Sequence, residues 1–208
     1  MLNLHKITGD IHSANCYIID NGIEAVIIDP GGEFGAINSY LENLRPVAIL
    51  GTHGHYDHIQ NVHQLKMQYS IPFYLHSDDK RLVKHANFYL KLVKGPGLIE
   101  IPEIDIWIND AEILDFSFVQ FRVIHTPGHT EGSVCFSFGN NLITGDLLMK
   151  NTVGRTNLPG GNSKKILGSV RTIAANFPDV NILPGHEENT NMKTELEYNT
   201  RLIDMLNK

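Results

Sequence analysis

The sequence predicts a mixed α/β protein folded as a four-layer helix–sheet–sheet–helix sandwich. In both halves of the chain, short apolar and β-branched runs are grouped with segments of helical spacing. No repeat, low-complexity segment or polar linker separates the halves, so we expect residues 1–208 to form a single domain. The chain has 208 residues, 42% of them hydrophobic, which is enough to bury a sizeable core.

The first half of the chain opens with strands. β-branched runs at Asn15–Ile19 and Ala25–Ile28, with the turn formers Asn21-Gly22 between them, predict an antiparallel start to a sheet. A helix is expected over Phe34–Leu44, ending at Arg45-Pro46 because proline breaks the pattern. The elements expected next are a buried strand, a helix, a strand and a capped helix: Val47–Leu50, Gln60–Tyr69, Ile71–Leu75 and Ser77–Val93.

The second half repeats this order of elements. Its expected strands and helix are Phe118–Ile124, Val134–Phe138, Asn141–Thr144, Lys164–Asn176 (the helix) and Asn181–Leu183. The tail Lys193–Asn207 has apolar residues near helical spacing and is expected to be a packing helix.

Composition excludes several classes of protein. The formal net charge of -6 provides no basic field, so nucleic acid is not an expected partner. The N-terminus lacks a basic segment followed by an apolar stretch, and no run is long enough to span a bilayer, so we expect a soluble, cytoplasmic protein without a membrane partner. No obligate protein partner is evident. Cys16 and Cys135 lie in apolar, strand-like segments and are expected to be buried thiols rather than a disulfide or metal ligands.

Four potential metal ligands fall within the short segment His53-Gly54-His55-Tyr56-Asp57-His58, between a buried strand and a helix. Imidazoles and a carboxylate suit zinc, iron or manganese. A loop at a strand end can aim alternate side chains in different directions, so His53 and His55 can share one metal while Asp57 and His58 face another. Solvated loop residues would explain one histidine, but not this density of ligand types.

Three further segments each end a strand in a potential ligand. Pro127-Gly128 forms a tight turn before His129, and Pro184-Gly185 does the same before His186. The apolar run Leu142-Ile143-Thr144-Gly145 ends in Asp146. Taken singly, each of these signals is weak.

Together the four segments resemble, in order and type, the ligand motifs of the metallo-β-lactamase superfamily, and the resemblance covers nearly the whole chain. It implies that His53, His55 and His129 hold a first metal, that Asp57, His58 and His186 hold a second, and that Asp146 bridges both. The expected cofactor is therefore two transition-metal ions per chain, zinc above all, with iron or manganese as alternatives. Asp29, in Ile28-Asp29-Pro30-Gly31, resembles the family's buried acid that supports the ligand loop.

Within the superfamily, Gly154-Arg155-Thr156 resembles the glyoxalase II-like branch, in which a basic residue at this position binds the glutathione part of a thioester. Arg155 could thus clamp a substrate carboxylate, and a surface arginine that closes a turn is the alternative. The chain departs from the branch at Asn157, where aspartate is frequent. It also lacks the C-terminal helical domain of the larger glyoxalase II enzymes, which makes it a short form.

The resemblance implies a metal-dependent hydrolase that cleaves a small acyl thioester such as S-lactoylglutathione. Two metals about 3.5–4 Å apart share a water and hold hydroxide ready at neutral pH, so no side-chain nucleophile is needed. Asp146 would position both ions, and Asp57 would help to orient the hydroxide. Asp146 stands where zinc β-lactamases usually carry a cysteine, which disfavours antibiotic hydrolysis.

Three alternatives stay open at this point. An iron-dependent persulfide dioxygenase keeps much of the same motif, and a lactone hydrolase on the same scaffold attacks a similar carbonyl. A purely structural zinc site is less expected, because such sites usually close with four ligands. The histidines outside the motifs are expected to have surface or core roles: His5, His12, His63, His76, His85 and His125.

Overall fold

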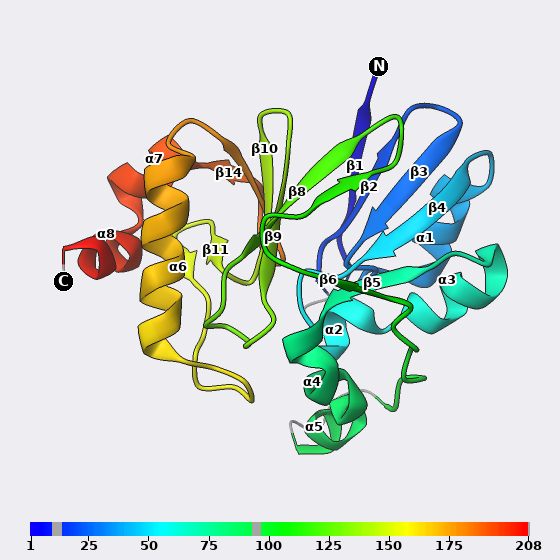
Figure 1. Cartoon of the computed structure of the whole chain (residues 1–208), viewed down its shortest axis with the longest axis horizontal. Coiled ribbons are helices and arrows are strands. Elements are labelled where there is room, and N and C mark those ends of the chain that lie inside the picture. The colour runs from blue at the N-terminus through cyan, green and yellow to red at the C-terminus, as the bar shows by residue number, and fades with distance from the viewer. Residues whose placement is uncertain (10–13, 93–96, 208) are drawn as a thin grey trace. The chain divides into compact units, whose positions relative to one another are not determined.

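The computed structural model describes residues 1–9, 14–92 and 97–207 (Figure 1). They fall into two compact units, unit 1 (Met1–Ile108 with Asp115–Val119) and unit 2 (Asn109–Leu114 with Gln120–Lys208). Each unit combines a six-stranded sheet with helices, so the predicted mixed α/β class with two sheets flanked by helices is confirmed. The organisation of the whole chain as one domain stays a prediction.

The sheet of unit 1 has the strand order β1-β2-β3-β4-β5-β6. Its strands are β1 (Asn3–Ile7), β2 (Cys16–Asp20), β3 (Glu24–Ile28), β4 (Arg45–Leu50), β5 (Phe73–His76) and β6 (Ile106–Ile108). The first three strands pair antiparallel, of which the β2–β3 pair was predicted, and the remaining pairs are parallel. Because β3 and β4 run parallel, Asp29 and the histidine motif follow strand ends at the same edge of this sheet.

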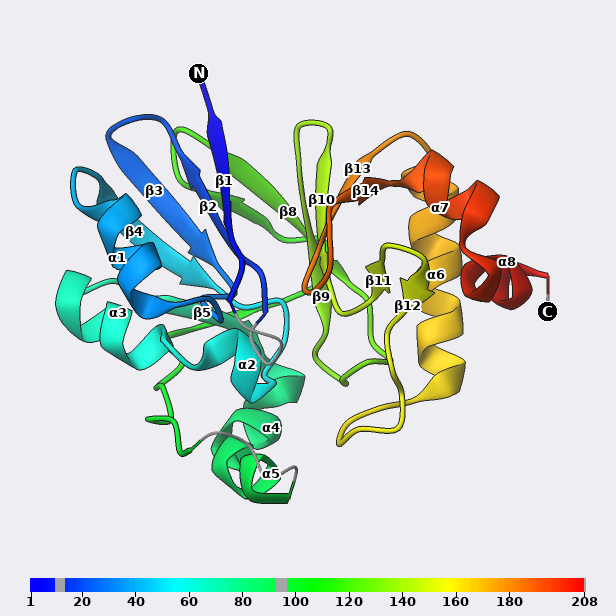
Figure 2. The same cartoon turned by 180° about the vertical axis from the view of Figure 1, so that it is seen from behind.

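Helices cover the sheet of unit 1 (Figure 2). They are α1 (Phe34–Leu41), α2 (Tyr56–Ile59), α3 (Val62–Tyr69), the short 3-10 turn Ser77–Asp79, α4 (Lys80–Lys84) and α5 (Ala86–Leu92). Ile37 and Leu41 of α1 and Leu65 of α3 are fully buried against strand residues in one apolar core. Removing this much apolar surface from water is the main stabilising contribution to the unit.

Unit 2 has the strand order β14-β13-β10-β9-β8-β7. Its strands are β7 (Ile113–Asp115), β8 (Gln120–His125), β9 (Val134–Phe138), β10 (Asn141–Gly145), β13 (Asn181–Pro184) and β14 (Thr190–Asn191). A separate hairpin pairs β11 (Leu148–Met149) with β12 (Thr152–Val153). The helices are α6 (Ser163–Asn176), α7 (Met192–Tyr198) and α8 (Thr200–Leu206). Ile166, Val170 and Ile173 of α6 pack into the core of this unit.

Several predicted boundaries differ from the structure. Strands β1 and β6 were not predicted, because both are short and partly exposed and carry little alternation. The helix expected over Ser77–Val93 is divided into a 3-10 turn, α4 and α5, with a break at His85, and Val93 lies outside the described residues. The terminal helix is divided at Asn199, whose side chain accepts a hydrogen bond from the Leu202 amide and so caps α8. None of the helices in the described ranges is long and apolar enough to cross a membrane.

Candidate metal centre

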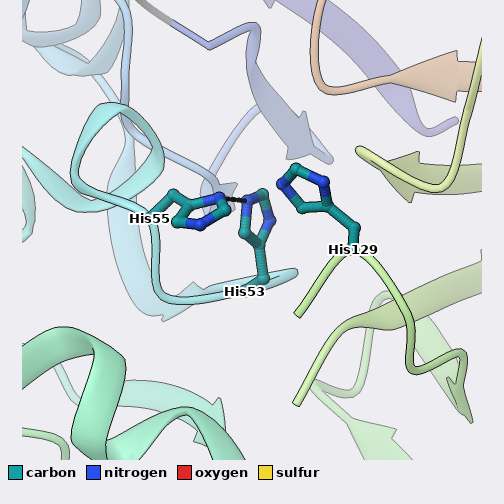
Figure 3. A group of neighbouring side chains, drawn as sticks. All are labelled: His53, His55 and His129. Atoms are coloured by element: carbon teal, nitrogen blue, oxygen red, sulfur yellow. Dashed lines mark hydrogen bonds between the residues drawn. The ribbon is translucent and has the colours of Figure 1, made fainter. Parts of the chain in front are cut away.

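Unit 1 carries four of the predicted ligands in the loop after β4 and the first turn of α2. His53 and His58 are buried, while His55 and Asp57 are half-buried. His53 Nε2 lies 3.0 Å from His55 Nδ1, the contact drawn in Figure 3. The pairs His53 with His58 and Asp57 with His58 also offer donor atoms within 4.8 Å of each other. The structure therefore brings these four side chains together, as the spacing in the sequence predicts.

Asp29 holds two of these ligands in position through hydrogen bonds, His58 directly and His53 through Thr52. Its backbone adopts a φ of 48°, a left-handed conformation that aspartate tolerates better than most residues. Its carboxylate accepts hydrogen bonds from the Thr52 amide at 2.7 Å and the Thr52 hydroxyl at 2.6 Å, and from His58 Nδ1 at 2.9 Å. Because the only Thr52 hydroxyl proton goes to Asp29, the hydroxyl oxygen must accept from His53 Nδ1, 3.1 Å away.

Asp79 is a buried acid that our sequence analysis missed. Its side chain is 1% exposed, and its carboxylate accepts a hydrogen bond from the Gly54 amide at 2.8 Å. Gly54 lies between His53 and His55, so this bond restrains the backbone that carries both. The only available signal was an aspartate at the start of a helix, which is usually a helix cap.

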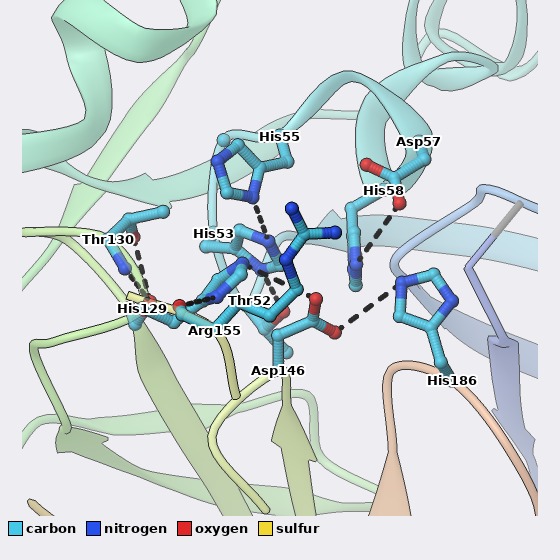
Figure 4. A network of polar contacts seen from close by, with 12 residues as sticks. Thr52, His53, His55, Asp57, His58, His129, Thr130, Asp146, Arg155 and His186 are labelled. Atoms are coloured by element: carbon cyan, nitrogen blue, oxygen red, sulfur yellow. Dashed lines mark hydrogen bonds and ion pairs between the residues drawn. The ribbon is translucent and has the colours of Figure 1, made fainter. Parts of the chain in front are cut away.

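Unit 2 carries the other three predicted ligands at strand ends, and all three meet. His129 Nε2 lies 3.3 Å from Asp146 Oδ2, and His186 Nε2 lies 3.6 Å from Asp146 Oδ1, with the carboxylate between the two rings (Figure 4). The loops that carry Asp146 and His186 are joined by a hydrogen bond from the Gly185 amide to the Gly145 carbonyl at 2.8 Å. This bond keeps the two ligands adjacent.

The segment after β12 supports His129 and Asp146. The Arg155 carbonyl accepts a hydrogen bond from His129 Nδ1 at 2.8 Å. Gly154 lies so close to the metal-ligand loop that a Cβ there would stand 1.7 Å from the Asp146 carbonyl oxygen. The Gly-Arg pair identified in the sequence is thus part of the support of two predicted ligands.

The guanidinium of Arg155 is exposed, and its Nε donates to Asn157 Oδ1 at 3.3 Å. A neutral amide therefore holds Arg155 where the glyoxalase II-like pattern frequently has an aspartate. Because Asn157 brings no negative charge, this partner does not offset the positive charge that the guanidinium offers to an anionic ligand.

The donor set and its hydrogen bonds fit transition-metal ions. His53, His58 and His129 each donate Nδ1–H to a hydroxyl, carboxylate or carbonyl oxygen, which leaves the Nε2 lone pair for a metal. Two donors sharing an ion at about 2.0–2.2 Å stand roughly 3.4 Å apart. The separations of 3.3 and 3.6 Å around Asp146 match that spacing.

Cys16 and Cys135 are free thiols with no exposed surface, as predicted. Burial raises the pKa of the Cys135 thiol to about 12, although a hydrogen bond with Thr126 lowers it somewhat. Burial, followed by the negative charge of Asp29, raises the pKa of Cys16 well above its ordinary value. Neither thiol is thus an accessible nucleophile at neutral pH.

The remaining described histidines have local structural contacts. His5 stacks on Tyr40, and His63 pairs with the exposed Glu100 at 2.8 Å. Nδ1 of His85 and Nε2 of His125 each bond to a backbone carbonyl. His76 Nδ1 accepts from the Asp78 amide. His12 lies outside the described residues.

Comparison with known proteins settles the family. The model of the metallo-beta-lactamase superfamily matches residues 9–186, a range that includes every predicted ligand. The chain belongs to the metallo-β-lactamase superfamily. The predicted fold is thereby confirmed.

Within the superfamily, one relative and two solved structures are similar to this chain over nearly its whole length. It is 30% identical over 210 residues to hydroxyacylglutathione hydrolase GloC of Haemophilus influenzae, covering 95% of this chain and 97% of that protein. The structure of the BLEG-1 B3 metallo-beta-lactamase is 32% identical, with a TM-score of 0.87 and coverage of 96% and 98%. The structure of TTHA1623 in a di-iron-bound form is 30% identical, with a TM-score of 0.85 and coverage of 94% and 98%. The chain is accordingly similar over nearly its whole length to a hydrolase, a metallo-beta-lactamase and a di-iron protein.

Proposed function

We propose that this chain is a metal-dependent hydrolase that cleaves a small acyl thioester, with S-lactoylglutathione as the first candidate substrate. The observation that carries the proposal is the double role of Arg155. Its carbonyl holds the predicted ligand His129, while its exposed guanidinium stays charged beside a neutral amide. A carboxylate-bearing substrate would thus be bound by the same residue that supports His129. The name of the Haemophilus relative supports the same substrate class.

The residues proposed to hold the metals are those the sequence predicted. His53, His55 and His129 would hold one ion, and Asp57, His58 and His186 the other. Asp146 would contribute one carboxylate oxygen to each. Zinc, iron and manganese all suit this donor set. The di-iron form of TTHA1623 supports iron as a candidate metal in addition to zinc. When bound, such a pair lowers the pKa of a shared water towards about 7 and polarises a carbonyl.

The side chains of this chain perform the remaining tasks. Arg155 orients the substrate by binding the substrate's carboxylate. Asp57 accepts a hydrogen bond from the attacking water and so orients the water's lone pair toward the carbonyl carbon. Asp29 keeps His58 in the tautomer whose Nε2 is unprotonated. Since both cysteines are buried, attack by water rather than by a protein thiol is the proposed route.

A second candidate is hydrolysis of a cyclic amide, favoured by the likeness to the BLEG-1 B3 metallo-beta-lactamase. A β-lactam also presents a carboxylate to Arg155 and a strained carbonyl to water. We rank it second because its product carries no thiolate, the leaving group that makes a thioester easier to cleave. Lactone hydrolysis and persulfide oxidation are the other two candidate activities, and the experiment below tests both.

The experiment supplies metal-loaded protein with S-lactoylglutathione, a chromogenic cephalosporin, a simple lactone and glutathione persulfide, with and without oxygen. We expect thiol release from the thioester, detected with a thiol reagent, at equal rates in both atmospheres. Turnover of the cephalosporin or the lactone alone would move the assignment to that substrate class. Oxygen uptake on the persulfide without thioester cleavage would overturn the proposal.

A further inference from the structure

A groove of about 420 Å³ lies within unit 2, between α6, α8 and the segment that follows β12. Ile166 and Leu167 of α6 and Met205 of α8 form its apolar wall. Gly154 and Thr156 line it as well, whereas Arg155 between them does not.

The polar residues of the groove are not satisfied by one another. Arg201 and Asp204 are three positions apart on α8 and therefore lie on one face of the helix. Thr156, Ser163 and Thr200 add hydroxyl groups. Within the described part of the chain, none of these five side chains makes a hydrogen bond or an ion pair. The groove thus offers a cation, an anion and hydroxyls beside an apolar wall.

We propose that this groove binds a small zwitterion, an α-amino acid with an apolar side chain such as L-leucine. The carboxylate would pair with Arg201, whose guanidinium has the fork geometry for it, and the ammonium would pair with Asp204. The apolar side chain would rest on Ile166, Leu167 and Met205. A simple anion would be repelled by Asp204 and a simple cation by Arg201, so the pair of charges selects a ligand that carries both.

The position of the groove links it to the metal-ligand loops of unit 2. Gly154 forms part of its surface, and the Gly154 amide donates to the Leu147 carbonyl at 3.0 Å, next to Asp146. The following residue, Arg155, accepts from His129. A ligand in the groove would therefore lie against the segment that supports His129 and Asp146.

Isothermal titration calorimetry of the intact, metal-loaded protein tests the proposal. The probes are L-leucine, 4-methylpentanoate, which lacks the ammonium, and 3-methylbutylamine, which lacks the carboxylate. We expect saturable 1:1 binding of L-leucine and at least roughly tenfold weaker binding of both analogues, because each loses one charged hydrogen-bonded contact. Equal binding of either analogue would contradict a zwitterion site, and so would the absence of saturable L-leucine binding up to roughly 10 mM.

Amino acids also chelate metal ions, so L-leucine could bind at the metal centre instead of in the groove. Variants of the groove distinguish the two binding sites. Arg201→Gln should weaken L-leucine binding at least about tenfold, whereas Arg171→Gln, an exposed control on α6 outside the groove, should leave it unchanged. Both positions are exposed, so neither variant is expected to unfold, and thermal melting checks this. Unchanged affinity in Arg201→Gln would show that the amino acid binds elsewhere and would overturn the proposal.

Discussion

The Gly54 amide donates a hydrogen bond to the carboxylate of Asp79 at 2.8 Å, and this acid is almost fully buried. A buried carboxylate is stabilised only when hydrogen bonds compensate for its lost hydration. The bond therefore stabilises the backbone position of Gly54. It thereby also stabilises the spacing of His53 and His55 on either side. Asp79 is in this account a positioning residue, acting through the backbone rather than on substrate.

Asp79→Ala should weaken metal binding by about 10–100-fold, the usual effect of losing an outer support of a metal ligand. Competition with a chelator measures this affinity without reference to turnover. Asp79→Asn, which keeps an acceptor oxygen, should restore much of it. Asp78→Ala, at a neighbour whose side chain is 53% exposed, is the matched control. Equal affinities in Asp79→Ala and the control would leave Asp79 with no role at the ligands.

Arg155→Ala should raise KM for S-lactoylglutathione with little change in kcat, because Arg155 is proposed to hold a carboxylate remote from the reacting carbonyl. Loss of one charged hydrogen bond corresponds to an increase of about tenfold or more. Arg122→Ala, on the exposed side of β8, serves as the control. An unchanged KM in steady-state kinetics would return Arg155 to the role of a surface residue.

Gly154→Ala should lower the free energy of unfolding by about 1–3 kcal/mol, because the new Cβ would collide with the Asp146 carbonyl. Gly168→Ala is the opposite control. Gly168 lies inside α6 with open space around it, so alanine should stabilise by about 0.5–1 kcal/mol. Urea denaturation of the two variants gives both values, and a shift of the same sign in both would contradict the close approach at Gly154.

The buried thiols predict a loss of stability at alkaline pH. Burial raises the pKa of Cys135 to about 12 in the folded state, so its stabilising contribution is complete below the unfolded value of 9.0 and is lost as pH rises between these two values. The slope for one thiol is about 1.4 kcal/mol per pH unit. Cys135→Ala should remove about that much of the slope of unfolding free energy against pH. An identical slope in the variant would show that Cys135 ionises in the folded protein.

The sequence predicted which side chains lie together because each candidate ligand follows a strand end, and strand ends are fixed by apolar runs that are easy to recognise. The motif after β4 and the turns before His129 and His186 are such cases. The sequence could not predict Asp79 as a support, because its partner Gly54 is 25 residues away and only the tertiary fold brings them together. The groove behind Gly154 has the same origin, since it depends on how α8 packs against α6.

The break at His85 shows a different limit of sequence reasoning. Apolar spacing continues from Leu82 to Leu90, and the pattern alone cannot tell one helix from two short ones. In the structure, His85 Nδ1 bonds to the Arg81 carbonyl at 2.8 Å, and that side-chain contact accompanies the end of α4.

Thiol release from S-lactoylglutathione by metal-free and metal-reconstituted protein is the most direct test of a metal-dependent thioester hydrolase. Because both cysteines are buried, the native protein should contribute little background to a thiol reagent. We expect no release above the spontaneous rate from metal-free protein, and full activity once close to two ions per chain are restored. Asp146→Ala should stay inactive under the same reconstitution, while His63→Ala should behave as the unmodified chain. Rapid thiol release by protein shown to be free of metal would contradict the account.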